Sequence, residues 1–156
     1  MTLLENLLEL YLHDLSEAFP LDVDPAGRFG YEALPLYFDE PDRRFPFLIE
    51  REGRVAGFAL VTRGSPATDD PSDLDVAEFF VLRRHRRGGA GRDAAFQLWD
   101  GMPGRWVVRV AVTNRPAVPF WEAVVQAYTG GVFETRRLRG QTSDFSVFLF
   151  RSREVQ

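Results

Sequence analysis

The chain has 156 residues, 19 basic against 23 acidic side chains, a formal net charge of −4 and a hydrophobic fraction of 45%. These values are typical of one soluble globular domain, large enough to be stable without a disulfide or a structural metal. There is no cysteine and there are only two histidines, which excludes thiol chemistry, a thiolate zinc site and a multi-histidine metal centre.

Two further absences narrow the class of protein. Every basic residue other than histidine is arginine, so a P-loop that depends on lysine and Schiff-base chemistry on the chain are excluded. No apolar run approaches the ~20 residues of a membrane span. No basic leader precedes the first leucines, so we expect a cytoplasmic protein without a membrane partner.

The first half of the chain predicts a helix, an irregular stretch and a hairpin. Leucines recur with helical spacing over residues 3–15, opposite acidic side chains, which predicts an amphipathic helix. Residues 22–44 are rich in Pro, Gly and Asp, with one apolar segment, 31–38, that could be a second helix. The acids of this stretch could attract a cationic substrate, although a solvated loop is the simpler explanation. The β-rich runs 45–50 and 55–61 flank a polar turn and predict an antiparallel hairpin.

The second half predicts alternating strands and helices. An acidic, disordered-looking loop over 65–75 leads to a strand at 76–82 and then to a helix at about 93–100. A strand buried on both faces is expected next, at 106–112, followed by a helix at 114–127. A closing hairpin is expected from the runs 132–138 and 145–150. This order predicts a single α/β domain over 1–156. The aromatic closing hairpin is typical of sheet packing, and it could also meet a second copy in a homodimer.

The most informative segment is a strand, a glycine-rich turn with arginines, and a helix. The turn is spelled Arg86-Arg87-Gly88-Gly89-Ala90-Gly91-Arg92. A helix N-terminus presents unpaired N–H groups and a partial positive charge, and glycines let phosphate oxygens come close to the backbone. The pattern fits neither a Walker motif nor a dinucleotide fingerprint. By charge alone the arginines resemble a nucleic-acid patch, but in an acidic chain, between a strand and a glycine turn, they favour a phosphorylated cofactor over nucleic acid.

This turn matches the R-x-x-G-x-G/A signature of the GNAT acetyltransferase superfamily through Arg86, Gly89 and Gly91. A second run resembles that family's N-x-x-A-x-x-F-Y-E pattern through Asn114, Ala117, Phe120, Trp121 and Glu122. With the element order, the resemblance spans nearly the whole chain. It implies an α/β fold with a mixed, mostly antiparallel central sheet, a splayed parallel pair of central strands, and flanking helices.

The resemblance also implies an activity and a cofactor site. The protein would move an acetyl group from acetyl-coenzyme A to a primary amine, either a small cationic amine or a peptide amino group, by direct attack in a ternary complex and without a metal. The pyrophosphate would lie on the glycine turn, and the pantetheine arm would bond along the preceding strand. The residues implied in cofactor binding are Phe79, Phe80, Val81, Arg86, Arg87, Gly88, Gly89, Ala90, Gly91, Arg92, Asn114 and Phe120.

Proton transfer is where the sequence departs from the family pattern. Glu78 would face the thioester and accept the proton of the amine, although it could equally be a partner for an arginine. The family often uses a tyrosine where this chain has Trp121, and an indole N–H is no acid. Tyr128 could replace it, or water could, or the thiolate could leave unassisted. His13 and His85 are expected at the surface. An alternative stays open: a non-catalytic module that binds or senses acyl-coenzyme A, which Trp121 favours.

Overall fold

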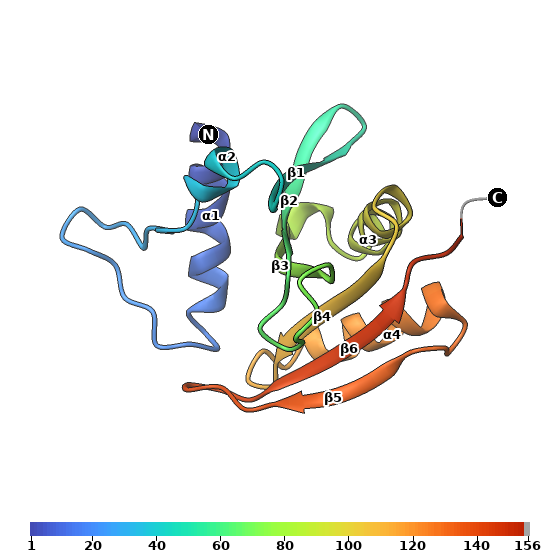
Figure 1. The fold of residues 1–156 in the computed structure, drawn as a ribbon. Helices are drawn as coiled ribbons and strands as arrows, with labels where there is room; N and C mark the ends of the chain where they lie inside the picture. Colours follow the sequence, from blue (N-terminus) through green and yellow to red (C-terminus); the bar gives the residue numbers. More distant parts are fainter. Residues whose placement is uncertain (155–156) are drawn as a thin grey trace.

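A mixed β-sheet with helices on both faces makes up the fold, and this computed structural model describes residues 1–154 (Figure 1). The elements in chain order are α1 (Thr2–Leu15), α2 (Leu36–Asp39), β1 (Arg44–Arg51), β2 (Arg54–Arg63), β3 (Leu74–Val81), the 3₁₀ turn η1 (Arg83–His85), α3 (Ala90–Gly101), β4 (Arg105–Ala111), α4 (Ala117–Thr129), β5 (Glu134–Leu138) and β6 (Phe145–Arg151). Within this part of the chain the strands form one six-stranded sheet in the order β1-β2-β3-β4-β6-β5. Only β3 and β4 pair in parallel, so the expected mixed, mostly antiparallel sheet is confirmed.

Two apolar layers hold the helices to the sheet. On one face, leucines of α1 pack with Phe58 and Leu60 of β2 and with Phe80 of β3. On the other face, α3 and α4 bury Trp99 and Trp121 against the central strands. The helices α1 and α2 therefore lie on the face opposite to α3 and α4 (Figure 1).

The irregular stretch before β1 contains less helix than expected. The apolar segment 31–38 was a candidate for a second helix, but α2 is a single turn that begins after Pro35. Proline disfavours the helical conformation for the residue before it, which explains why the helix does not extend back to residue 31. In contrast, α3 begins at Ala90, earlier than the predicted residue 93, directly after Gly89.

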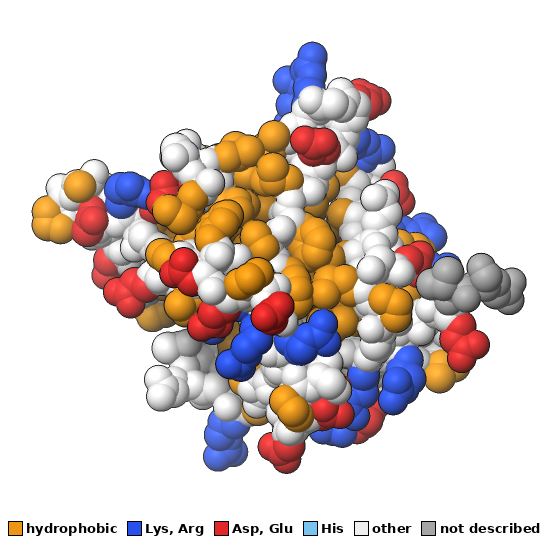
Figure 2. All heavy atoms as spheres, turned by 45° about the horizontal axis from the view of Figure 1, so that its top comes forward, with side chains coloured by type: hydrophobic (Ala, Val, Ile, Leu, Met, Phe, Trp, Pro, Cys, Tyr) orange, Lys and Arg blue, Asp and Glu red, His pale blue; other side chains and the backbone are white. Residues whose placement is uncertain are grey.

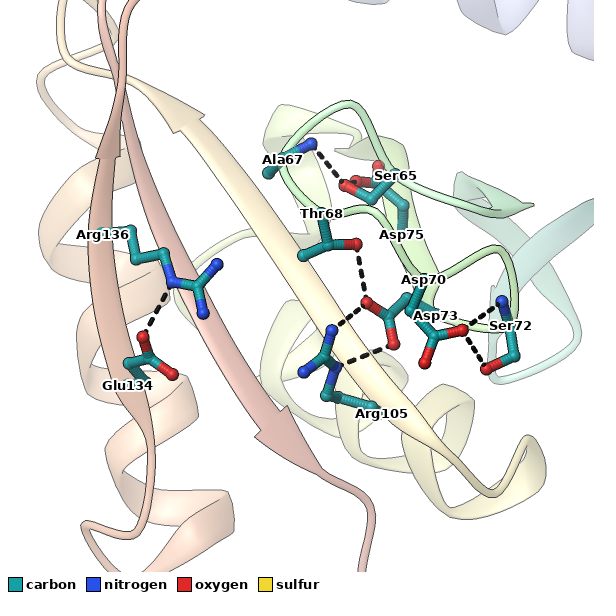
Figure 3. A network of polar contacts seen from close by, with 10 residues as sticks. All are labelled: Ser65, Ala67, Thr68, Asp70, Ser72, Asp73, Asp75, Arg105, Glu134 and Arg136. Carbon is teal, nitrogen blue, oxygen red and sulfur yellow. Dashed lines mark hydrogen bonds and ion pairs between the residues drawn. The ribbon is translucent and has the colours of Figure 1, made fainter.

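The acidic loop predicted over 65–75 is more ordered than the sequence indicates. Strand β3 already begins at Leu74, and the carboxylates of Asp73 and Asp75 are buried. Asp73 accepts hydrogen bonds from Arg105 Nε and from the hydroxyl of Thr68, at 2.8 and 2.6 Å (Figure 3). These acids are buried because arginines of β4 neutralise them, and this part of the disordered-loop prediction was wrong.

A bulge in β3 coincides with the point where β3 and β4 part. Leu60 pairs with Glu78 and Val61 with Val76, so Ala77 is an extra residue opposite the β2 ladder. Regular alternation would turn Glu78 to the same face as Val76. The bulge instead turns Glu78 toward α1, while Val76 packs on the α3 and α4 side. Pairing between β3 and β4 ends at Val76 and Val108, so beyond these residues the parallel strands are splayed.

The surface around the upper edge of the sheet is apolar in its centre. Figure 2 shows hydrophobic side chains gathered across this face, with acidic and basic side chains around them. Exposed apolar side chains of the described residues include Met1, Leu36, Phe38 and Phe47. No helix of the described chain is both long and apolar enough to cross a bilayer.

Candidate functional site

A cavity of about 780 Å³ opens where β3 and β4 separate. Glu78 and Phe79 of β3, Arg109 of β4, Asn114 before α4 and Trp121 of α4 all line it. On the α1 side, the cavity is lined by tyrosines from α1, from the loop before α2 and from α2. The structure therefore brings Glu78 and Asn114, which the sequence singled out, to one cavity.

Two tyrosine hydroxyls hold the Glu78 carboxylate. Tyr11 of α1 donates to Oε2 at 2.5 Å, and Tyr31, in the loop before α2, donates to Oε1 at 3.1 Å. Burial raises the pKa of Glu78, and this rise is opposed by the two hydroxyl donors and by the positive charge of Arg109. A carboxylate with a raised pKa in a cavity is well suited to accept a proton.

Sequence reasoning missed the tyrosines around Glu78. Tyr11 fits the apolar face of an amphipathic helix, and Tyr31 and Tyr37 lie in a short apolar segment, so none of them carries a local signal of a polar site. Burial and the negative charge of Glu78 raise the pKa of all three. They therefore stay protonated, and Tyr11 and Tyr31 act as donors to Glu78.

Arg109 is paired with Asp75 and not with Glu78. Its Nε and Nη2 each donate to one oxygen of Asp75 at 2.8 Å. Burial works to lower the pKa of Arg109, but the hydrogen bonds and charge of Asp75 outweigh burial and raise it. The hydroxyl of Ser65 donates to Asp75 as well. Within residues 1–154, Glu78 has no arginine partner, which argues against the alternative in which Glu78 only balances an arginine.

The glycine turn has the backbone of an anion cradle. Gly89, the residue before α3, has a φ of +82°, and Arg87 has a φ of +67°. None of the described side chains caps the start of α3, so the first N–H groups of the helix are free to bind a ligand. A Cβ on Gly91 would lie 3.0 Å from Cζ of Phe120. Glycine at this position lets Phe120 close over the helix start.

The arginines near the turn divide into two groups. Arg86 is turned toward α1, where Nη2 donates to Asp14 at 2.6 Å, while its Nε donates to the carbonyl of Val81 at 2.8 Å. Arg87 and Arg92 are exposed. Arg86 therefore holds the turn to α1 and β3. The guanidinium of Arg92 lies over the Phe96 ring, 5.0 Å from its centroid, and both Arg87 and Arg92 stay at the surface near the start of α3.

The sequence analysis did not identify a basic residue outside the turn that contacts it, Arg51. Arg51, at the end of β1, donates from Nη2 to the carbonyl of Gly88 at 2.8 Å. The hairpin and the turn enclose a hollow of about 490 Å³, lined by Arg51, Glu52, Arg54, Arg84, His85, Arg86 and Gly88. His85 is half-buried in this hollow, whereas His13 is exposed as expected. No local motif links the hairpin to the turn, because they are far apart in the chain.

The backbone of β3 is available along the cavity. One edge of the strand pairs with β2 as far as Val81, but the described strands leave its other edge without a partner after Val76. Phe79 packs edge-on against Trp121, with ring centroids 4.9 Å apart. Phe80 is buried against α1, so only its backbone can reach a ligand.

The position of Tyr128 does not support its expected role as the acid. Its hydroxyl donates to Asp100 at 2.7 Å and accepts from the backbone N–H of Arg153 at 3.0 Å. The ring is buried against Trp99 and Phe150, outside the lining of the large cavity. Tyr128 lies about two helical turns beyond Trp121 on α4, so it is displaced along the helix axis, away from the splayed strands.

The described residues contain no group of three or more His, Asp or Glu placed to hold a metal ion. The candidate site consists of one carboxylate with two tyrosine donors, a strand edge without a partner and a glycine-rich helix start.

Comparison with known proteins gives an independent result. Residues 4–125 match the family model described as the acetyltransferase (GNAT) family. No curated protein matches the chain. Among solved structures, the chain is similar to a ribosomal-protein-alanine N-acetyltransferase from Brucella melitensis, with 16% identity, a TM-score of 0.63 and coverage of 94% of this chain and 93% of that one. It is also similar to a spermidine N-acetyltransferase from Vibrio cholerae in complex with CoA and spermine, with 12% identity, a TM-score of 0.55 and coverage of 92% and 89%. At these identities the likeness shows a shared fold.

Proposed function

Because the chain belongs to the acetyltransferase (GNAT) family, we propose that it moves an acetyl group from acetyl-coenzyme A to a primary amine. The observation that carries this proposal is the position of Glu78. Its carboxylate lies in the cavity at the splayed strands, where tyrosine hydroxyls orient it. A base at this place can take the proton that an ammonium group must lose before it attacks a thioester.

The residues of the cleft fit acetyl-coenzyme A, which supplies the acetyl group as a thioester. The turn from Gly88 to Arg92, at the uncapped start of α3, would hold the pyrophosphate through backbone N–H groups, with Arg87 and Arg92 adding positive charge. The free edge of β3 from Phe79 to Val81 would bond to the pantetheine arm as an added strand does. Asn114 would bond the end of this arm, and Phe120 would pack beside it.

Glu78 is the base in the proposed reaction. It accepts a proton from the ammonium group, directly or through water, and leaves the amine nitrogen with a free electron pair. The nitrogen then forms a bond to the acetyl carbon while the carbon–sulfur bond breaks. As the amide forms, the nitrogen loses its second proton, and water carries this proton to the leaving thiolate. Water fills this role because the cavity lining contains Trp121 and does not contain Tyr128.

The proposed acceptor is a small cationic amine or a peptide amino group. Both present a primary ammonium group, which the Glu78 carboxylate can bind. The similar structures named above include a spermidine and a ribosomal-protein-alanine N-acetyltransferase, which represent the two classes. Asp69 and Asp70 line the same cavity together with Arg43, Arg44 and Arg63, so the charge of the lining does not favour one acceptor class over the other.

A second candidate function is a non-catalytic module that binds or senses acyl-coenzyme A. Trp121 favours it, because this buried indole lines the cavity where an acid would be expected. The two candidates share the cofactor cradle and differ only in turnover.

The experiment that separates them is calorimetric titration with acetyl-coenzyme A, followed by thiol-release assays against a panel of amines and peptides. Binding with thiol release that depends on an amine supports the enzyme. Tight binding without thiol release for any member of the panel favours the sensor. Absence of binding contradicts both.

A further inference from the structure

The Glu78 carboxylate is held by two hydroxyls that come from different parts of the chain. An ionised carboxylate has about four lone-pair sites, two on each oxygen. Tyr11 occupies one site on Oε2 and Tyr31 occupies one on Oε1. One site on each oxygen is left for other donors.

We propose that Tyr11 and Tyr31 are positioning residues, which fix the Glu78 carboxylate in one orientation and reserve its two remaining acceptor sites for the ammonium group of the acceptor. The inference rests on the proposed function, because it describes how the base of that reaction is held. Neither tyrosine takes a proton in this scheme, and both act through Glu78.

Both tyrosines are held in place by contacts that do not involve Glu78. The ring of Tyr11 packs edge-on against Phe58 and Phe80, with centroids 5.6 and 5.7 Å away. Tyr31 follows a loop segment that α1 anchors, since the backbone N–H groups of Phe29 and Gly30 donate to Glu9 at 2.8 and 2.9 Å. The two hydroxyls are therefore held in place by contacts other than those with Glu78, and they define where the carboxylate can lie.

The charged and titratable groups that face Glu78 come from every element around it. They are Tyr11 of α1, Tyr31 of the preceding loop, Tyr37 of α2, Asp75 of β3 and Arg109 of β4. Arg109 and Asp75 form a close ion pair, so their charges largely cancel at Glu78. The two hydroxyl bonds are then the main interactions that favour the ionised carboxylate against the cost of burial.

The test is a pH titration of the Glu78 carboxyl carbon by NMR in protein labelled with carbon-13 at glutamate side chains. The Glu78 signal is identified by its absence in Glu78→Gln. We expect the titration midpoint to rise by about one pH unit in Tyr11→Phe and in Tyr31→Phe, because each substitution removes one hydrogen bond to the charged form. Tyr128→Phe is the matched control, since it removes a buried hydroxyl that bonds to Asp100 instead, and its Glu78 midpoint should equal that of the wild type.

The outcomes are distinct. A Glu78 midpoint that is the same in the wild type and in both phenylalanine variants overturns the inference. A rise in only one variant overturns the role of the other tyrosine. An equal rise in Tyr128→Phe would show a general effect of lost hydroxyls and would overturn both roles. The titration needs no acceptor, so its failure is distinguishable from a failure to find acetyl transfer.

Discussion

Arg51 donates a hydrogen bond of 2.8 Å to the carbonyl oxygen of Gly88, which joins the tip of the β1–β2 hairpin to the glycine turn. The contact brings a positive charge to the back of the proposed phosphate site. It also fixes the Gly88 peptide, so the N–H groups that follow keep a constant direction.

Replacement of Arg51 by alanine should therefore weaken the binding of coenzyme A. We expect a loss of roughly three- to tenfold, because an exposed charge-assisted hydrogen bond is removed. Arg54→Ala is the matched control, since Arg54 lies on the same hairpin and carries the same charge, but bonds to no residue of the turn. Calorimetry measures both, and an equal loss in the two variants would show that only net charge matters.

A carboxylate placed on the turn should block the cofactor. Gly89→Glu introduces negative charge and a side chain at a φ of +82°, and we expect coenzyme A affinity to fall roughly a hundredfold or more. Gly101→Glu makes the same change at the far end of α3, where nothing lies within 4 Å, and it should bind normally. Unchanged affinity in Gly89→Glu would contradict the proposed site. Thermal unfolding of both variants shows whether the fold is kept.

The ion pairs that Arg105 and Arg109 of β4 form with Asp73, just before β3, and with Asp75 of β3 should contribute unequally to stability. Arg109→Met leaves the fully buried Asp75 carboxylate unpaired, and we expect the free energy of unfolding to fall by about 3–5 kcal/mol. Arg105→Met should cost less, about 1–2 kcal/mol, because the Arg105 side chain is 36% exposed. Urea unfolding measures both values, and an equal or reversed order would contradict this description.

Glu78 should reduce stability at neutral pH. Burial raises its pKa above the usual value of 4.5, so the folded chain holds this proton more tightly than the unfolded chain does. The stability that this proton provides is complete below the usual pKa and is lost as the pH rises through the raised pKa. Glu78→Gln should therefore unfold at a higher temperature than the wild type near pH 7, and the difference should shrink near pH 4. A difference that grows on acidification would mean that the sign of the pKa shift is wrong.

The fold could be predicted because its signals are local in sequence. The glycine turn, the run from Asn114 and the alternating strands and helices each lie within a short segment. The bulge at Ala77 could not be predicted, because pairing with β2 sets the register of β3. The burial of Asp73 and Asp75 was missed for a similar reason, since it depends on arginines of β4 more than 30 residues away.

The site could be predicted only in part. Glu78 and Asn114 were identified and lie in one cavity, whereas Tyr128 lies in the core. Tyr11 and Tyr31 were missed because they lie 67 and 47 residues from Glu78 and look like apolar residues of helices. Such contacts exist only once the chain has folded, so periodicity carries no trace of them.

The most direct test of the central claim is the pH dependence of kcat/KM for acetyl transfer in the wild type and in Glu78→Gln. Acetyl-coenzyme A affinity is measured in parallel by calorimetry. If Glu78 is the base, Glu78→Gln binds acetyl-coenzyme A normally and loses turnover, most of all at low pH, where the amine is protonated. An unaltered pH–rate profile in Glu78→Gln would remove Glu78 from the mechanism.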